Sequence, residues 1–250
     1  MTSLTQFLIV RRINMYSDYH VHSNYSNDSQ STIEQICMAA IKKGMKTVGI
    51  TDHMDAVHEQ RMNDPHEIEK FFYEFEKIRE RYGDQIHLIP GFEFSEPYEN
   101  IDAFERTKKY PFEYCMCSVH HCANDKFPSP YSIDVYRAVH EFLQNVKKTI
   151  VLDGVDAIGH IDLIRRYYGT FPYVQDELRE IFELVIKKGI WLEVNTSCLP
   201  KKKVYSQIDY LEEYKRLGGV KVVLGSDAHT IADIGRDFTK LKMSDVQIKI

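Results

Sequence analysis

Short apolar segments alternate with longer amphipathic segments along most of the chain. Seven apolar segments have the length and β-branched content typical of buried parallel strands, at residues 16–20, 47–50, 86–89, 114–119, 157–161, 190–194 and 220–224. Between them, apolar residues at three- and four-residue spacing predict helices over residues 32–43, 65–82, 101–110, 132–148, 175–188 and 206–217. This alternation predicts an α/β domain with a parallel sheet, either closed into a barrel or open and doubly wound.

No repeat, low-complexity tract or linker divides the 250 residues, and this length is sufficient for one domain with a substantial core. We expect a single domain over residues 15–250, preceded by an N-terminal extension over residues 1–14. The extension contains an apolar run at residues 7–10, but Arg11 and Arg12 follow the run, whereas a signal peptide carries its charges before it. No segment approaches the roughly 20 apolar residues that cross a bilayer, so no membrane partner is expected.

Composition and charge narrow the class of protein. A hydrophobic content of 43% and a charged content of 28% are ordinary for a globular domain. The net charge of −5, with one short basic run at residues 201–203, gives no support for nucleic acid as a partner. The five cysteines form no regular framework, which favours a reducing cytoplasm over a disulfide-stapled secreted fold. The glycine-rich turn of a dinucleotide site and the P-loop are both absent.

Histidine and carboxylate residues recur where the predicted strands end. The candidates are His20, His22, Asp28, His53, Glu93, His120, His160, Asp227 and His229. Because the carboxyl ends of parallel strands converge on one face, these side chains should meet in one place. Several charged groups buried together without partners would be strongly disfavoured, and bound metal ions remove that penalty. Alternate positions of an extended segment point the same way, so His20 and His22 can reach one ion, as can Asp227 and His229.

The number and type of these candidates indicate the metals. Nine candidates exceed the three protein ligands of a single catalytic zinc, so we expect two to three divalent ions. A set of nitrogen and oxygen donors without thiolate favours Zn, Mn or Fe. The remaining histidines lack this placement. His121 points away from His120 in a strand and could at most support a ligand, and surface or packing roles are expected for His58, His66, His87 and His140.

Four short motifs carry a family resemblance over residues 16–229. Residues 19–23 (Tyr-His-Val-His-Ser), 51–53 (Thr-Asp-His), 159–160 (Gly-His) and 226–229 (Ser-Asp-Ala-His) resemble the PHP (polymerase and histidinol phosphatase) superfamily. The resemblance implies a distorted (β/α)7 TIM-like barrel with a trinuclear metal site. The implied ligand sets are His20, His22, Glu93 and Asp227 for one ion, Glu93, His120 and His160 for the second, and Asp28, His53 and His229 for the third.

Within this superfamily the chain looks most like the stand-alone histidinol-phosphate phosphatases of histidine biosynthesis. Its size, Asp18 and Asp28, and the segment at residues 159–167 carry this likeness. The resemblance implies a phosphomonoester hydrolase acting on a small phosphorylated substrate, L-histidinol phosphate. Arg165 resembles the family's phosphate-binding arginine, and Arg166 is the second choice. The catalytic residues expected on this basis are Asp227, His229 and Arg165.

The chain departs from the family pattern after the sixth predicted strand. Pro200 stands where a second phosphate-binding arginine is usual, and Cys198 stands where glycine is usual. Lys201 or Lys202 could make this contact, although a lysine ammonium lacks the two-pronged geometry of a guanidinium. A substrate other than histidinol phosphate, such as a nucleotide or another small phosphate ester, therefore remains an alternative. A non-catalytic metal-binding PHP module is another, but it would be expected to have lost ligands. The oligomeric state is not predicted.

Overall fold

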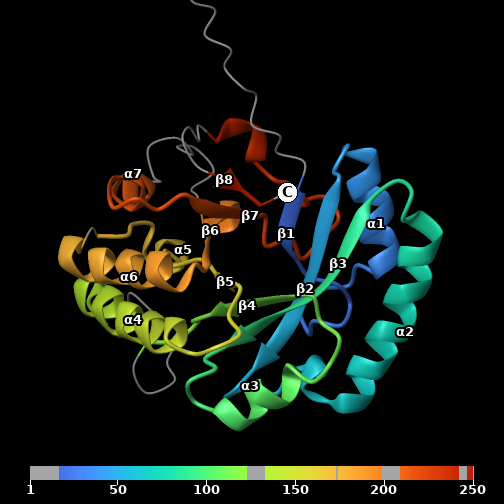
Figure 1. The fold of residues 1–250 in the computed structure, drawn as a ribbon, viewed down its shortest axis with the longest axis horizontal. Helices are drawn as coiled ribbons and strands as arrows, with labels where there is room; N and C mark the ends of the chain where they lie inside the picture. Colours follow the sequence, from blue (N-terminus) through green and yellow to red (C-terminus); the bar gives the residue numbers. More distant parts are fainter. Residues whose placement is uncertain (1–16, 123–132, 173, 199–208, 242–246, 250) are drawn as a thin grey trace, which may run out of the picture.

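The computed structural model describes residues 17–122, 133–172, 174–198, 209–241 and 247–249. These residues contain one parallel sheet with the strand order β1-β2-β3-β4-β5-β6-β7-β8. Its strands are β1 (Ser17–Val21), β2 (Thr47–Asp55), β3 (His87–Ser95), β4 (Tyr114–Ser118), β5 (Ala157–Ile158), β6 (Trp191–Asn195), β7 (Lys221–Gly225) and β8 (Gln247–Ile248). The sheet curls into a distorted TIM-like α/β barrel (Figure 1). The extension expected over residues 1–14 lies outside the described residues.

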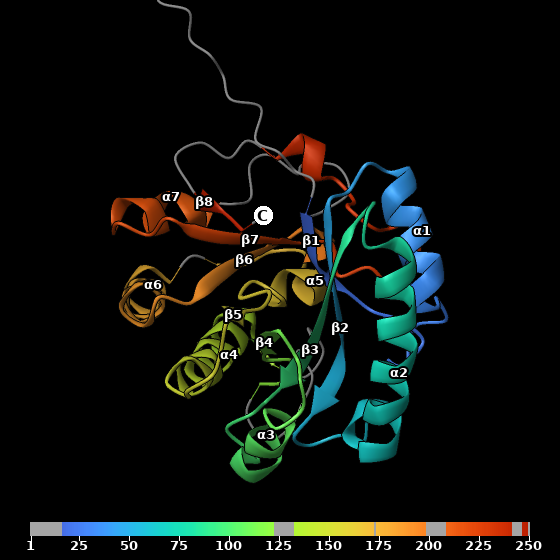
Figure 2. The same cartoon turned by 45° about the vertical axis from the view of Figure 1, so that its right-hand side comes forward.

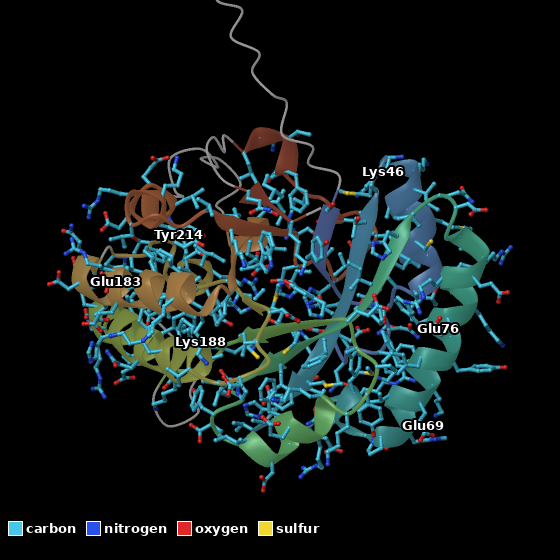
Figure 3. All side chains as sticks on the ribbon, in the orientation of Figure 1. Lys46, Glu69, Glu76, Glu183, Lys188 and Tyr214 are labelled. Carbon is cyan, nitrogen blue, oxygen red and sulfur yellow. The ribbon has the colours of Figure 1, made fainter. Side chains whose placement is uncertain are left out.

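Most helices lie on the outside of the curled sheet, whereas the short helix at residues 164–168 lies nearer the middle of the molecule, as the views in Figures 1 and 2 show. The helices are α1 (Ile33–Lys42), α2 (Pro65–Tyr82), α3 (Ile101–Thr107), α4 (Val135–Ile150), α5 (Ile164–Tyr168), α6 (Gln175–Lys188) and α7 (Asp209–Arg216), with short 3-10 segments η1 (Arg61–Asn63), η3 (Thr196–Cys198) and η5 (Phe238–Lys240). Charged side chains such as Glu69, Glu76 and Glu183 point outward from this layer (Figure 3). No helix in the described part of the chain is long and apolar enough to cross a membrane.

Local sequence accounts for where the first two of these helices begin. Thr32 and Gln35 form a capping box at the start of α1, in which each side chain accepts a hydrogen bond from the other's backbone N–H. Asp64 caps α2, and Pro65 occupies its first position, where no backbone donor is needed. Each helix buries an apolar face against the sheet, and the core between the helices and the strands is continuous.

Strands β2 and β3 extend beyond the predicted apolar segments. The segments at residues 47–50 and 86–89 stop where polar residues begin, but pairing continues to Asp55 and Ser95. His53 lies opposite Glu93 in this register, so both candidate ligands belong to paired strands rather than to loops. Their side chains are held by the sheet, which limits their freedom before any ligand binds. Helix α5 was not predicted, because five residues are too few for a periodic pattern.

The sheet has one strand more than the seven expected from the sequence. The additional strand, β8, has two residues and pairs with the first half of β7. The ammonium group of Lys249, just after β8, lies 4.7 Å from the ring centroid of Tyr114 and 5.3 Å from that of Tyr19. A segment this short carries no hydrophobic periodicity, so sequence patterning could not reveal it.

The barrel closes where the first strand of the sheet, β1, meets the residues that follow β7. The His22 N–H donates to the Ala228 carbonyl at 2.9 Å, and Val21 forms a parallel bridge with Ala228. Below this closure, a small apolar cluster fills the barrel interior, with Tyr19, Tyr114 and Met116 among its members. The candidate ligands therefore lie on the side of this apolar cluster where the strands end.

Candidate metal centre

All nine candidate ligands lie together at the carboxyl ends of the strands. Three groups of their donor atoms each lie within 4.8 Å of one another. The groups are His20, His22 and Asp227; Glu93, His120 and His160; and His22, His53 and His229. Asp28 joins the third group, because its Oδ2 lies 3.1 Å from His229 Nε2 and 3.6 Å from His53 Nε2. The structure thus brings together the residues that the strand-end pattern singled out.

Glu93 lies at the centre of the three groups. Its Oε2 is 2.7 Å from His53 Nδ1 and 3.5 Å from His20 Nε2. Its Oε1 is 2.8 Å from His160 Nε2 and 3.7 Å from His120 Nε2. One carboxylate therefore faces imidazoles from four segments of the chain, which is the placement needed for a ligand shared between ions.

The loop after β1 is shaped by Asp52, which is fully buried. Its Oδ1 accepts hydrogen bonds from the Ser23 N–H and the Ser26 hydroxyl, each at 2.7 Å. Ser26 Oγ in turn lies 3.1 Å from His22 Nδ1 and accepts the His53 N–H at 3.0 Å. Asp52 thereby holds the backbone around two ligand-bearing segments.

A second buried carboxylate, Asp18, organises the end of β7. It accepts hydrogen bonds from the Ser226 N–H at 3.0 Å and from the Gly235 N–H at 2.8 Å. Asp227, which follows Ser226, has a backbone φ of 51°, in the left-handed region. Asp227 Oδ1 lies 3.3 Å from His22 Nε2 and 3.5 Å from His229 Nδ1. With His20 Nε2 at 3.7 Å, this carboxylate faces three imidazoles, and a left-handed backbone at such a residue points to a functional position.

The electrostatics of the cluster favour charged carboxylates, and they shift its imidazoles in different directions: despite burial, nearby carboxylates raise the pKa of His20 and His53, whereas burial lowers that of His22. Burial opposes ionisation of Glu93, but His20 and His53 hold its pKa well below the usual value. Burial and the neighbouring His53 and His229 hold the pKa of His22 well below the usual value. His20 Nε2, His22 Nε2 and Glu93 Oε2 are buried without a hydrogen-bond partner. Buried nitrogen and oxygen atoms that lack a hydrogen-bond partner are suited to bind divalent metal ions.

The two arginines of α5 lie in different surroundings. Arg165 is 9% exposed, and its Nε donates to Asp162 Oδ2 at 3.2 Å. Arg166 Nη2 instead reaches Asp227 Oδ2 and Ser197 Oγ, each at 2.5 Å. The structure therefore places Arg166, the second choice from the sequence, against the metal-ligand group. Pro200, Lys201 and Lys202 lie outside the described residues.

Sequence reasoning missed several polar residues around the ligands. Asp55 and Ser95 each follow a ligand by two positions on the extended strands β2 and β3, and Ser95 Oγ lies 2.8 Å from His120 Nδ1. Glu96 accepts the backbone N–H groups of His120 and His121, and His121 Nδ1 lies 3.3 Å from its Oε1. The two-residue period of a strand could have revealed Asp55 and Ser95 had the strands been predicted at full length.

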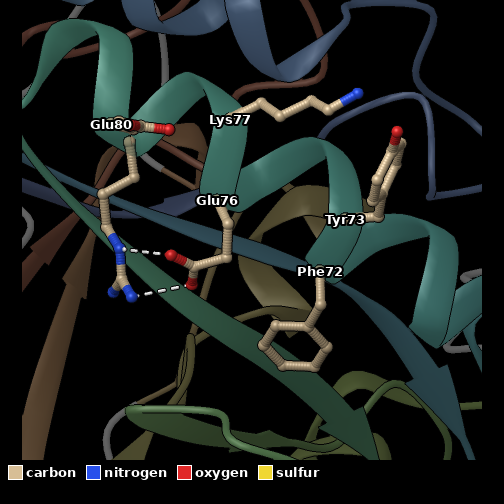
Figure 4. A pocket seen from close by; sticks show the side chains of 6 residues that line it. Phe72, Tyr73, Glu76, Lys77 and Glu80 are labelled. Carbon is tan, nitrogen blue, oxygen red and sulfur yellow. Dashed lines mark hydrogen bonds and ion pairs between the residues drawn. The ribbon is translucent and has the colours of Figure 1, made fainter.

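A hollow on the outer face of α2 lacks the histidine and carboxylate group found at the barrel mouth. Lys77 lies over the Tyr73 ring, 3.8 Å from its centroid, and Arg79 pairs with Glu76 at 2.7 Å. Figure 4 shows these side chains spread along one helix rather than converging. The described residues that line it contain no group of histidine and carboxylate side chains like that at the barrel mouth, so the hollow does not compete as a candidate site.

Comparison with known proteins agrees with this architecture. The sequence profile of the PHP domain family matches residues 18–197, and the chain belongs to this family. The match begins in β1 and runs through the end of β6, so it includes seven of the nine candidate ligands.

Individual relatives match over most of their length. The chain is 29% identical over 249 residues to the probable histidinol-phosphatase of Clostridium acetobutylicum, covering 92% of this chain and 93% of the relative. It is 27% identical over 243 residues to the histidinol-phosphatase of Lactococcus lactis, covering 85% and 83%. A crystal structure of the Lactococcus lactis histidinol phosphate phosphatase complexed with zinc, L-histidinol and phosphate superposes with a TM-score of 0.75 at 23% identity, over 90% of this chain and 92% of that chain.

Proposed function

We propose that this protein is a metal-dependent phosphatase that hydrolyses L-histidinol phosphate to L-histidinol and phosphate in histidine biosynthesis. The observation that carries the proposal is the convergence of nine histidine and carboxylate side chains, with Glu93 at their centre, at one end of the barrel. The names of the full-length relatives support the substrate. We also propose that residues 15–250 form a single domain, since one sheet runs from β1 to β8 in the described residues.

Two to three divalent ions, Zn, Mn or Fe, are proposed to occupy the three ligand groups. His20, His22, Glu93 and Asp227 would hold one ion, Glu93, His120 and His160 a second, and Asp28, His53 and His229 a third. Such ions lower the pKa of bound water towards about 7 and neutralise phosphoryl oxygens. The chain's own contribution is to hold the donors at fixed spacing, with Glu93 shared between groups and Asp18 and Asp52 anchoring the segments that carry them.

Arg166 is proposed to bind the phosphoryl group. It already reaches a carboxylate oxygen and a hydroxyl at the edge of the ligand group, so its guanidinium can exchange these partners for phosphoryl oxygens. Arg165, favoured from the sequence, donates to Asp162 instead, and we propose a positioning role for it. Lys201 and Lys202 remain proposed as a second phosphate contact.

Asp227 and His229 are proposed to assist the departure of the alcohol as well as to bind metal. The His229 side chain is 27% exposed, the largest value among the six candidate imidazoles, so it lies where the leaving group would exit. Its Nδ1 lies 3.0 Å from the Asp227 carbonyl oxygen, which fixes the orientation of the ring. We also place the enzyme in the cytoplasm, where thiols such as Cys115 and Cys117, 3.8 Å apart, remain reduced.

Metal analysis of the purified protein, combined with hydrolysis assays, tests the proposal. We expect two to three metal ions per chain and faster hydrolysis of L-histidinol phosphate than of p-nitrophenyl phosphate or nucleoside monophosphates. A faster rate on another phosphomonoester would transfer the proposal to that substrate. One metal ion or fewer, with no reactivation by Mn or Zn, would exclude the multinuclear site. Bound metal without hydrolysis of any phosphoester would indicate a non-catalytic module.

A further inference from the structure

Glu193 is a buried carboxylate in the middle of β6 that belongs to none of the three ligand groups. It is fully buried, and its side chain enters the barrel interior above the apolar cluster. A buried carboxylate without partners would be strongly disfavoured, so its position is explained only by the groups that it contacts.

Both oxygens of Glu193 contact ligand-bearing residues. Oε1 lies 2.7 Å from His20 Nδ1, and Oε2 accepts the backbone N–H of His160 at 2.6 Å. The Asn195 side-chain amide lies 3.3 Å from each oxygen and donates to the carboxylate from the same strand. The carboxylate is thus held between one ligand of the first group and one ligand of the second.

The bond to His20 determines which ring nitrogen is available. When Nδ1–H donates to Glu193, Nε2 is the nitrogen left for a metal ion, and it faces Glu93 Oε2 at 3.5 Å and Asp227 Oδ1 at 3.7 Å. A histidine whose remote nitrogen donates to a carboxylate is fixed in one tautomer and orientation, and it becomes a better metal ligand.

The barrel wall leaves room for this carboxylate at one particular glycine. Gly225 of β7 lies opposite Asn195 in the sheet register. A Cβ at this position would approach Glu193 Oε1 to 1.8 Å and the Cβ of His20 to 2.7 Å. Any side chain at this position would displace the carboxylate or the imidazole, so the glycine is part of the same arrangement.

We infer that Glu193 is a positioning residue that orients His20 for metal binding and ties the first ligand group to the second through His160. The inference rests on the proposed metal-dependent function, and it concerns metal affinity rather than substrate. Glu193 contacts no reacting atom itself. Its effect is transmitted through the His20 ring and the His160 backbone.

Glu193→Gln is the most direct test, because it preserves shape and removes charge. The Gln amide NH₂ would face either the His20 Nδ1–H or the His160 N–H, both of which are donors. One hydrogen bond is then lost, or His20 changes tautomer and presents a protonated Nε2 to the metal. We expect a loss of Zn²⁺ affinity of about 10- to 100-fold, the usual range for partners of metal ligands.

The measurement is the Zn²⁺ dissociation constant of metal-free protein by chelator competition, with the unfolding midpoint of the metal-free protein recorded in parallel. Glu213→Gln is the matched control, because Glu213 is a similarly buried carboxylate that pairs with Arg179 and Arg216 on the outer helices. The control should bind Zn²⁺ like the wild type. If the Gln variant does not fold, Glu193→Asp retains the charge but withdraws it from His20, and should also weaken Zn²⁺ binding.

The dissociation constant decides the inference. A Zn²⁺ dissociation constant that rises tenfold or more in the Glu193 variant but not in the Glu213 variant supports the positioning role of Glu193. An unchanged dissociation constant, with only a lower unfolding midpoint, would assign Glu193 a purely structural role and overturn it. Failure of the wild-type protein to bind Zn²⁺, Mn²⁺ or Fe²⁺ would instead refute the proposed metal-dependent function.

Discussion

The adjacent arginines of α5 provide a sharp test of how the site binds phosphate. Replacing Arg166 by Ala removes the guanidinium that reaches Asp227 Oδ2 and Ser197 Oγ at the ligand group. A hydrogen bond to a charged group is worth about 1.5–3 kcal/mol. If Arg166 contacts the phosphoryl group in the transition state, kcat/KM for L-histidinol phosphate should fall by about 10- to 150-fold. The Arg166 side chain is 37% exposed, so stability should change little.

Replacing Arg165 by Ala should lower stability and leave kcat/KM nearly unchanged, the reverse of the effect expected for Arg166→Ala. The variant leaves Asp162, which is 1% exposed, without its charged partner. Burial already raises the pKa of Asp162, and Arg165 opposes that rise. Removing one partner of a buried pair costs about 3–5 kcal/mol. For a chain of this size this corresponds to a decrease in Tm of about 6–20 °C, with kcat/KM of the folded fraction nearly unchanged.

Steady-state kinetics, metal content and thermal unfolding of the two variants separate these roles. Arg166→Lys is the useful companion, since it keeps the charge but loses the two-pronged contact, and we expect partial activity. A large loss of kcat/KM in Arg165→Ala at unchanged Tm, together with wild-type kinetics in Arg166→Ala, would refute our assignment. That outcome would restore Arg165 as the phosphate-binding residue.

Three further predictions address the metal centre and the core. Glu93→Gln should reduce the bound metal measured by elemental analysis and lower kcat/KM by more than the ~10- to 100-fold typical of outer partners, whereas full metal content would refute its shared role. Removing the metals with a chelator should lower Tm and re-addition should restore it, because ions at 100 times Kd stabilise by about 2.7 kcal/mol per site; an unchanged Tm would contradict a site that binds metal. Burial raises the pKa of Cys37 from 9.0 to about 11, so its contribution to stability is complete below pH 9 and is lost as pH rises towards 11; denaturant unfolding should show this loss in the wild type and less of it in Cys37→Ala.

The location of the metal centre could be predicted from the sequence because it follows from two simple geometric rules. Parallel strands bring their carboxyl ends together, and alternate strand residues share a face. Placing His20 and His22 on one side therefore required only the recognition of a strand, and Asp227 and His229 followed in the same way. Glu93 could be singled out as a candidate ligand, but its contacts with five imidazoles depend on distances across the barrel that no local pattern contains.

The features that escaped prediction depend on orientation or on very short elements. Our proposal of Arg166 rather than Arg165 depends on how α5 is rotated, and a five-residue helix gives no periodic signal for that rotation. Strand β8 has two residues and is held by pairing with β7 and by the Lys249 ammonium, which lies over the rings of Tyr19 and Tyr114.

Glu193 shows most clearly why a chain pattern cannot identify every residue that shapes a site. In the sequence it is an acidic residue within an apolar strand, and a structural ion pair would explain it equally well. Its relation to the metal centre appears only when β1, β5 and β6 are seen together, with His20 on one oxygen and the His160 backbone on the other. If Glu193 acts as inferred, the spacing between two ligand groups is determined by a residue that binds no metal. Changes at Gly225 should then alter metal affinity as strongly as changes at the ligands' outer partners, although Gly225 has no donor atom in its side chain.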